Sequence, residues 1–229
     1  MNHAIASLPL LERRTLSEAA YAHLRDLLAS GRVAPGERLS LRDLSEALGV
    51  SVMPVREAVS RLIADRALEV APNRAVRVPV MTRAQFRELA ETRAGVEGLA
   101  AARAALRRTP AQLRAIEEAE AALRENSGTT DLGDAVALNR DFHFALYEAA
   151  GLPTLLDVIG GLWLKAGPVI NLDLRHSRDR LTAGHALRCH AAALGAIRAQ
   201  DAEAARAAIA EDIARAADFI IDKGGLPEG

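Results

Sequence analysis

Apolar side chains recur every three or four residues along most of this chain, and polar residues fill the positions between them. This spacing predicts amphipathic helices. The first predicted helix begins at Thr15, where the residues have the spacing of a capping box, and ends near Ser30. Two shorter helices, at 41–48 and 51–62, lie on either side of Gly49, a residue that suits a turn with positive φ. A helix-turn-helix is therefore expected near the start of the chain.

The second helix of this pair has a well-marked start. Ser51 is the expected N-cap, whose side chain can accept a hydrogen bond from the unpaired backbone N–H groups of the first turn. Pro54 falls in that turn, where a missing N–H breaks no helical bond. Helix-turn-helix proteins insert this end into the major groove of DNA. The side chains presented there are Ser51, Val52, Met53 and Arg56.

A pair of short strands is predicted after the helix-turn-helix. Residues 68–78 alternate between apolar and polar side chains around Pro72-Asn73, as in a hairpin. Residues 33–39, before the helix-turn-helix, are predicted to form a turn segment. A hairpin in this position makes the fold a winged helix, and the tip of the wing carries Arg74, which is placed to reach a phosphate or the minor groove.

The rest of the chain is predicted to be helical. Its helices are expected at 82–108, 110–126, 132–150, 153–171, 178–199 and 201–223. Antiparallel helices with many alanines make a compact bundle. The predicted fold class is therefore mainly α, with an N-terminal winged helix-turn-helix in residues 1–80 and a C-terminal antiparallel bundle of about six helices in residues 81–229. Such a bundle can hold a small molecule or a metal between facing helices.

Charge and composition refine this prediction. Half of the 229 residues (50%) are hydrophobic and only 3% are aromatic, which suits a helical core rich in alanine and leucine. The net charge is −1, but the first 80 residues hold 11 Arg against 9 Asp plus Glu, and no Lys. Arginine has a planar fork that fits phosphates and guanine edges. The predicted DNA-binding part is therefore equipped for DNA although the whole chain is not basic.

The cellular compartment can also be predicted. The single cysteine, Cys189, excludes an intramolecular disulfide and fits a reducing compartment, where it is expected to be a small buried side chain. No apolar run reaches the roughly 18 residues that a membrane-spanning helix needs. We therefore expect a cytoplasmic protein with no membrane partner.

Four polar residues of the bundle are candidates for a ligand site. Asn139 and His143 are four residues apart, so both project from one face of one predicted helix. His190 and Asp212 lie on consecutive helices, each about 10 to 12 residues and so about 16 Å from the turn at Gln200. The spacing therefore allows His190 and Asp212 to meet. The alternative is that all four are ordinary polar groups of the core or the surface.

Several motifs between residues 15 and 80 resemble the GntR family of bacterial transcription regulators. They are Tyr21, Leu24-Arg25, Gly31, Pro35-Gly36-Glu37-Arg38-Leu39, Leu44, Leu48-Gly49-Val50-Ser51, Pro54-Val55-Arg56-Glu57-Ala58 and Arg61-Leu62. The resemblance implies that the DNA-facing residues are Arg42, Ser51, Val52, Met53, Pro54, Arg56, Arg74 and Ala75. The family often has arginine and threonine at the places of Val52 and Met53, and glycine at that of Ala75. Because an apolar pair packs on thymine methyl groups, we expect an operator that differs from the common family sequence.

Residues 83–222 resemble the ligand-binding domain, of the FCD type, that accompanies the FadR-like branch of this family. The resemblance lies in Arg93-Ala-Gly-Val-Glu97, Asn139-x-x-Phe-His143, His190-Ala-Ala-Ala-Leu-Gly-Ala-Ile197 and Asp201. Many such domains bind a divalent metal through an Asp or Asn and three His, which implies a site here for Zn, Ni, Mn or Fe. Its ligands would be Asn139, His143, His190 and Asp212, where Asp212 stands in place of the last histidine. His176 and His185 are reserve candidates.

The resemblance also implies a regulated function. We expect a transcriptional repressor that binds double-stranded DNA at a palindromic operator as a homodimer. A small organic acid would be the effector, since its carboxylate can ligate the metal while an arginine pairs with it. The candidate arginines are Arg93, Arg140 and Arg175. The alternative from another class is a metal-dependent enzyme with a site of two histidines and one carboxylate.

Overall fold

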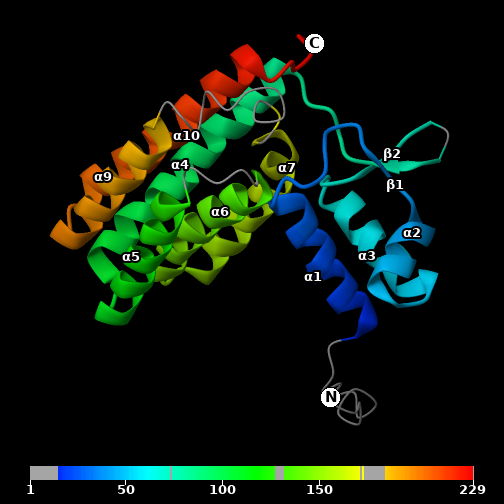
Figure 1. Ribbon diagram of the computed structural model, residues 1–229, viewed down its shortest axis with the longest axis horizontal. Coiled ribbons are helices and arrows are strands. Elements are labelled where there is room, and N and C mark those ends of the chain that lie inside the picture. The colour runs from blue at the N-terminus through cyan, green and yellow to red at the C-terminus, as the bar shows by residue number, and fades with distance from the viewer. Residues whose placement is uncertain (1–14, 73, 127–131, 171, 173–183, 229) are drawn as a thin grey trace, which may run out of the picture.

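The computed structural model describes residues 15–72, 74–126, 132–170, 172 and 184–228, and for residues 132–135 it describes the backbone only. Its elements form a small N-terminal module and a larger helical bundle (Figure 1). The predicted fold class, mainly α with a winged helix-turn-helix before a bundle, is confirmed. No helix among the described residues has the length and apolar character needed to cross a membrane.

The described part of the N-terminal module contains three helices and three short strands. They are α1 (Leu16–Ala29), β1 (Arg38–Leu39), α2 (Leu41–Leu48), α3 (Val52–Ala64), β2 (Glu69–Val70) and β3 (Val76–Arg77). The predicted capping box opens α1, because the Glu18 N–H donates to Thr15 Oγ1 over 3.2 Å. Gly49 joins α2 to α3 with a φ of 64°, the left-handed conformation expected at that turn. Buried Leu24 and Val55 belong to the core between α1 and α3.

The sheet has one strand more than the sequence pattern predicts. β3 pairs antiparallel with β2, which is the predicted hairpin, and also with β1, so the strand order is β1-β3-β2. The prediction of a turn throughout residues 33–39 is therefore wrong at β1. Its pairing extends to Glu37, whose carbonyl accepts from the Val78 N–H over 2.9 Å. Partners so distant in sequence leave no local signal in a two-residue strand.

The bundle contains six helices among the described residues. They are α4 (Arg83–Arg107), α5 (Pro110–Glu125), α6 (Leu132–Ala149), α7 (Pro153–Ile170), α9 (His185–Ala199) and α10 (Ala202–Lys223). Their ends agree with the predicted ends to within one residue, except at the start of α9. The expected start at residue 178 lies outside the described residues. The described helix begins after Gly184, which has a φ of 63°.

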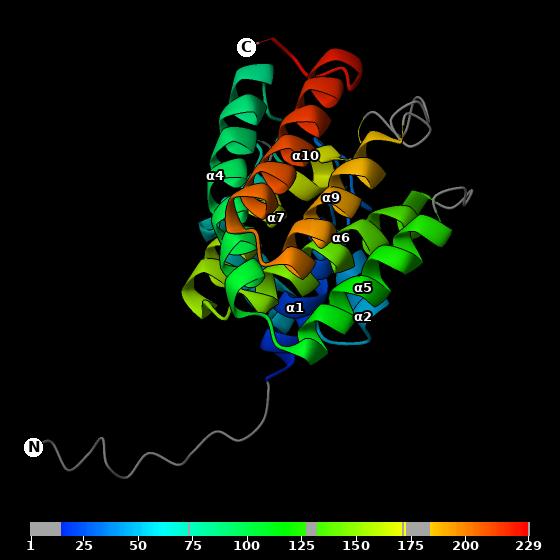
Figure 2. The same cartoon turned by 90° about the vertical axis from the view of Figure 1, so that its left-hand side faces the viewer.

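The helices of the bundle pack closely because their facing side chains are small. α4 and α10 lie side by side, and α9 lies against α10 (Figure 2). Ala101 and Ala104 of α4 and Ala205 of α10 are buried in this core, together with larger side chains such as Phe142 and Ile209. The facing sides of α4, α6, α7, α9 and α10 bring together the polar side chains that form the candidate ligand site.

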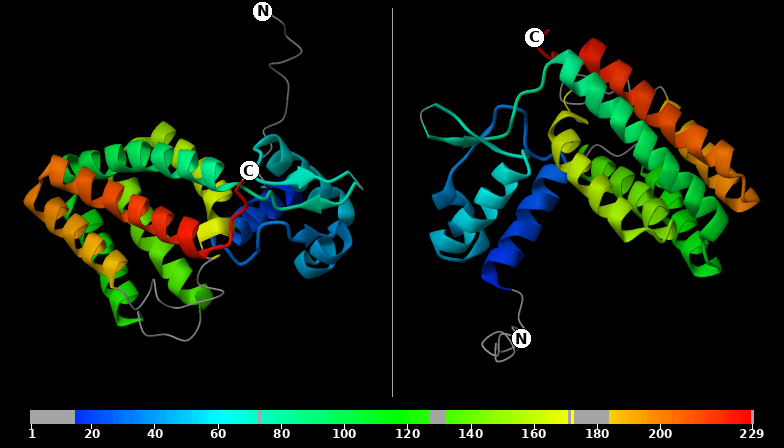
Figure 3. Two further views of the ribbon diagram at one scale, coloured as in Figure 1. Left: turned by 90° about the horizontal axis from the view of Figure 1, so that it is seen from above. Right: turned by 180° about the vertical axis from the view of Figure 1, so that it is seen from behind.

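Helix α7 belongs to both parts of the molecule. Trp163 lies in the hydrophobic core of the bundle, whereas the next residue, Leu164, lies in the core of the N-terminal module. α7 also packs along α1 (Figure 3). The approach is closest at Gly167, where an added Cβ would overlap the Leu28 carbonyl oxygen and lie 2.8 Å from Ala29 Cα. The two parts are thus joined by a shared helix as well as by the chain between them.

The start of α3 differs from the expectation for Ser51. Ser51 is the N-cap, as predicted, but its side chain makes no capping hydrogen bond. The N-cap side chains of α1, α2, α4, α5 and α10 all accept from the backbone N–H three residues further on. In α3 that position is Pro54, which has no N–H to donate. The predicted capping bond is therefore wrong, and the Ser51 hydroxyl is left for another partner.

Candidate functional site

The N-terminal end of α3 presents the side chains that the sequence predicts to face DNA. Val52 and Met53 are 36% and 62% exposed, although both are apolar. Ser51 and Arg56 beside them are exposed as well, and Pro54 is half-buried. Exposed apolar groups next to a hydroxyl and a guanidinium provide what direct readout of bases in the major groove requires.

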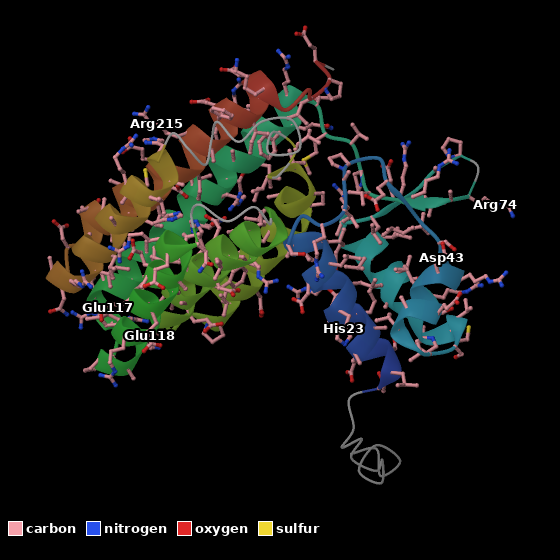
Figure 4. The ribbon with its side chains drawn as sticks, in the orientation of Figure 1. His23, Asp43, Arg74, Glu117, Glu118 and Arg215 are labelled. Carbon is pink, nitrogen blue, oxygen red and sulfur yellow. The ribbon has the colours of Figure 1, made fainter. Side chains whose placement is uncertain are left out.

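The predicted DNA-facing arginines are spread over the same module. Arg42 on α2 and Arg56 on α3 are exposed, and Arg74 stands at the tip of the wing, away from the bundle (Figure 4). Arg74 has a φ of 62°, so the left-handed residue of the wing turn precedes Ala75, where the family often has glycine. Within the described part of the chain, none of these three arginines forms an ion pair. Their guanidinium groups are therefore open to phosphates or bases.

A further exposed arginine of this module, Arg38, is not among the predicted DNA-facing residues. Arg38 lies on β1, an edge strand of the wing sheet, and its side chain is exposed. A turn was predicted there, and a turn gives no reason to place the side chain beside the wing. Only the pairing of Arg38 with Arg77 across the strands shows where it lies.

Two imidazoles and a carboxylate meet inside the bundle, each from a different helix. His143 on α6 and His190 on α9 both bring Nε2 to 3.3 Å from Oδ2 of Asp212 on α10. All three side chains are buried. Their candidate ligand atoms lie within 4.8 Å of one another, which suits a single metal ion after a small contraction. The structure thus brings together three of the four predicted ligands, including the pair that the helix spacing allowed to meet.

The pKa shifts of His143 and Asp212 favour the protonation states of metal ligands. Burial lowers the pKa of His143, and this outweighs the opposing effect of Asp212. Burial alone would raise the pKa of Asp212, but His190 and His143 hold it well below its usual range. A neutral imidazole and an ionised carboxylate are the forms that bind a divalent metal. The residues present therefore fit the metal that the family resemblance implies.

A small cavity borders the cluster. Its volume is about 80 Å³, whereas pockets for drug-sized ligands start at roughly 300 Å³. Asn139, the fourth predicted ligand, lines the cavity together with His143 and Asp212. Much of the remaining lining is apolar, including Phe86 and Phe219. The cavity therefore suits a small molecule with both a polar and an apolar part.

A chain of buried hydrogen bonds leads away from His143. Its Nδ1 lies 2.8 Å from the hydroxyl of Tyr147, which donates to Oε2 of Glu97 over 2.5 Å. Trp163 Nε1 donates to the same oxygen over 3.1 Å. Arg93 pairs with both oxygens of Glu97, over 2.6 and 3.2 Å, and its guanidinium lies 4.6 Å from the Trp163 ring centre. Glu97 is fully buried and links α4, α6 and α7.

The candidate effector arginines have different positions. Arg93 lines the cavity, although Glu97 already occupies one side of its guanidinium. Arg140 does not line it: its side chain lies in a groove between α1 and α6, 3.5 Å from Asp26. The structure places Arg140 away from the cluster because successive helix residues turn by about 100°, which points position 140 away from Asn139. Arg175 lies outside the described residues. Arg215 on α10 lines the cavity and was not predicted, although it lies one helical turn after Asp212.

Of the two reserve candidates for metal ligands, the structure describes only His185. His176 lies outside the described residues. His185 lines the cavity and forms a second group with Cys189 and Glu211, whose candidate ligand atoms also lie within 4.8 Å of one another. Arg188 lies 3.2 Å from His185 Nδ1, and Arg215 pairs with Glu211 over 3.2 Å. These guanidinium groups make the second group less favourable for a cation than the first. Cys189 is buried, as expected for a small core side chain.

The fold and the buried cluster together are typical of one class of protein: a DNA-binding regulator with a helical second domain that contains a buried polar cluster beside a cavity. Comparison with known families agrees with this class. Residues 16–78 match the bacterial regulatory proteins of the gntR family, and residues 88–215 match the FCD domain. The chain belongs to the GntR family of transcriptional regulators and carries an FCD domain.

Individual relatives support the same assignment. The chain is 33% identical over 193 residues to the HTH-type transcriptional regulator McbR of Escherichia coli K12, which covers 82% of this chain and 85% of McbR. The solved structure of E. coli McbR superposes with a TM-score of 0.85 and 30% identity, over 92% of this chain and 99% of that chain. A putative GntR regulator from Rhodococcus sp. RHA1 gives a TM-score of 0.69 and 27% identity, over 90% and 97% of the two chains.

These relatives also decide between the classes of function. The family and the relatives consist of transcriptional regulators, not enzymes. The alternative of a metal-dependent enzyme is therefore set aside. A cluster of two histidines and one carboxylate, in this setting, belongs to a regulator.

Proposed function

We propose that this protein is a repressor that binds a palindromic operator as a homodimer, and that a small organic acid bound at a divalent metal controls its affinity for DNA. Residues 1–80 would bind DNA, and residues 81–229 would bind the effector and form the dimer. One observation carries the proposal. The buried cluster of His143, His190 and Asp212 borders a small cavity, in a bundle that shares α7 with the DNA-binding module.

The DNA-reading surface is proposed to combine three kinds of contact. Val52 and Met53 would pack on thymine methyl groups, and Arg56 would pair with a guanine edge. The Ser51 hydroxyl has no capping bond because Pro54 follows at the third helical position. It would donate to a phosphate, or donate to or accept from a base. Arg42 and Arg74 would contact phosphates or the minor groove and so place the module on the duplex.

The ligand site is proposed to hold the metal through His143, His190 and Asp212, with the neutral oxygen of Asn139 as a weaker fourth ligand. When bound, the metal supplies open coordination positions that accept a carboxylate oxygen. Arg93 and Arg215 border the cavity and would pair with that carboxylate. The apolar lining and the small volume favour a short acid with an apolar portion over a large or highly charged one.

Control of DNA binding is proposed to pass through α7. Trp163 contacts Glu97 beside the ligand site, and Leu164 lies in the core of the DNA-binding module. An effector can shift the DNA-binding modules only if it binds the two states of the dimer unequally. Repression is proposed by analogy with RspR of E. coli K12, which is named a transcriptional repressor and is 29% identical over 147 residues, 64% of each chain.

The test uses the full chain and an operator selected from random DNA by the purified protein. Operator affinity is measured by fluorescence anisotropy for metal-free protein, for Zn²⁺-loaded protein, and for loaded protein with a panel of short carboxylic acids. We expect one class of acid to change the affinity by about 5- to 150-fold, and only in the loaded protein. His143→Ala should abolish metal binding and the response. His23→Ala, which changes an exposed histidine of α1, is the matched control.

Two results would contradict the proposal. The first is wild-type protein that binds no divalent metal, because the cluster would then be an ordinary set of buried polar groups. The second is an operator affinity that stays constant for every acid shown by calorimetry to bind the loaded protein.

A further inference from the structure

We propose that Tyr147 and Glu97 are positioning residues, which hold the ring of His143 in the tautomer that can bind the metal. The proposal rests on the proposed metal site and extends it to side chains that touch neither the metal nor the effector. Its basis is the direction of each hydrogen bond in the buried chain from Glu97 to His143.

The direction of these bonds is set at Glu97. Arg93 pairs with its carboxylate over 2.6 and 3.2 Å, and an ionised carboxylate can only accept hydrogen bonds. The Tyr147 hydroxyl, 2.5 Å from Glu97 Oε2, must therefore donate its single proton there. Its oxygen then has only lone pairs for its other neighbour, His143 Nδ1, at 2.8 Å. The hydrogen of that contact must come from Nδ1.

This fixes the other nitrogen of the same ring. A neutral imidazole carries one N–H, so a hydrogen on Nδ1 leaves a lone pair on Nε2. Nε2 of His143 lies 3.3 Å from Asp212 Oδ2. A lone pair and a carboxylate oxygen repel each other unless a cation lies between them. The ring is therefore held in the form in which a metal ion, ligated by both atoms, makes the contact favourable.

His190 lacks this support. Its Nε2 lies 3.3 Å from the same Asp212 oxygen, but its Nδ1 is buried without a hydrogen-bond partner among the described residues. Nothing in the described structure therefore keeps the hydrogen on Nδ1. In metal-free protein we expect His190 to donate Nε2–H to Asp212, which is a normal hydrogen bond. Metal binding should then change the tautomer of His190 and leave that of His143 unchanged.

The first test is the tautomer itself, measured by long-range ¹H–¹⁵N NMR of the histidine side chains in metal-free, full-length protein. His143→Ala and His190→Ala identify the two rings. The expected result is Nδ1–H for His143 and Nε2–H for His190. An Nε2–H form of His143 would overturn the proposal. This measurement needs no metal, so it stays decisive even if the protein binds none, which would overturn the proposed function instead.

The second test compares two substitutions that each remove one hydrogen bond to Glu97 Oε2. Tyr147→Phe breaks the chain to His143, whereas Trp163→Phe removes the neighbouring donor and leaves the chain intact. We expect Tyr147→Phe to weaken Zn²⁺ affinity by about 10- to 100-fold, measured against a chromophoric chelator. The tautomer of His143 should shift toward Nε2–H in the same variant. Trp163→Phe should change neither quantity by as much.

Equal losses of metal affinity in the two variants would refute the positioning role, since they would reflect only a general disturbance around Glu97. Circular dichroism checks that both variants are folded. Should Tyr147→Phe fail to fold, the NMR spectrum of the wild-type protein still decides the proposal.

Discussion

Three glycines of α7 allow a graded test of how firmly the DNA-binding module is joined to the bundle. An added Cβ would meet nothing within 4 Å at Gly161. At Gly160 its nearest neighbour would be Arg25 Nη2 at 2.9 Å, which is the end of a flexible side chain. At Gly167 its neighbours would be backbone atoms of Leu28 and Ala29, at the end of α1. One chemical change thus meets open space, a movable group and a fixed backbone.

The expected free energies follow from these surroundings. Alanine is more favourable than glycine in a helix by about 0.8–1.0 kcal/mol, so Gly161→Ala should raise the free energy of unfolding by about that much. Gly160→Ala should gain most of it, because Arg25 can move. Gly167→Ala gains the same helix propensity, but the added Cβ pushes α1 away from α7. Overpacking of this kind lowers the free energy of unfolding by about 1–3 kcal/mol. A Cβ directly before Pro168 also disfavours helical backbone, which adds to the cost.

We therefore expect Gly167→Ala to be less stable than the wild type by about 1–2 kcal/mol, and less stable than Gly161→Ala by about 2–3 kcal/mol. Urea unfolding measures the difference, followed by circular dichroism and by the fluorescence of Trp163, the only tryptophan of the chain. Because Trp163 is buried in the bundle core, its signal reports on that core. Equal stability of Gly167→Ala and Gly161→Ala would refute the close contact between α1 and α7.

Three further predictions concern single side chains. Ser40→Ala should lower the free energy of unfolding by about 1 kcal/mol because Ser40 caps α2. Ser51→Ala should lower it by less, because Ser51 makes no capping bond. Urea unfolding compares the two variants, and equal losses would contradict the explanation that Pro54 removes the capping bond of Ser51. Arg56→Ala should weaken specific operator binding by about 1–3 kcal/mol and reduce discrimination between bases. Arg74→Ala should instead lower the magnitude of the slope of log affinity against log salt concentration by about 1. Anisotropy titrations at several salt concentrations separate the two effects. Burial, reinforced by two nearby carboxylates, raises the pKa of the Cys189 thiol to about 11. About one thiol in a thousand is then ionised at pH 8. Thiol alkylation of the folded protein at that pH should therefore be about 100-fold slower than for a thiol of ordinary pKa, and its rate should increase as the pH rises from 9 to 11. Fast alkylation at pH 8 would contradict this prediction.

The parts of the fold that sequence predicts well are those with local signals. Thr82 and Thr109 open α4 and α5 with capping boxes, and the helix ends there follow the prediction closely. The contact between His190 and Asp212 is predictable for a related reason: two antiparallel helices joined by a short turn place residues equally far from the turn at the same level. Both inferences need only helix geometry and nearby residues.

The parts that sequence does not predict depend on elements far apart in the chain. β1 forms because it pairs with β3. The buried hydrogen bonds of Glu97 form only when the packing of α4, α6 and α7 brings its partners close to it. These partners are Arg93, Tyr147 and Trp163. Arg140, a candidate effector arginine, lies away from the cavity beside the cluster, because a residue's position in sequence does not fix the neighbour it faces. The same limit hid Arg215, whose place beside the cavity depends on how α10 is rotated.

The shared position of α7 limits which DNA-binding modules could be combined with this bundle in a hybrid regulator. Recombination near residue 80 would give a bundle a new N-terminal module, but Leu164 and Gly167 would remain the residues that pack against the original module. A module whose α1 ends in a different conformation, or whose core leaves no room for Leu164, would not seat on that helix. A hybrid regulator should therefore inherit the module-facing positions of α7 from the same parent as its DNA-binding module.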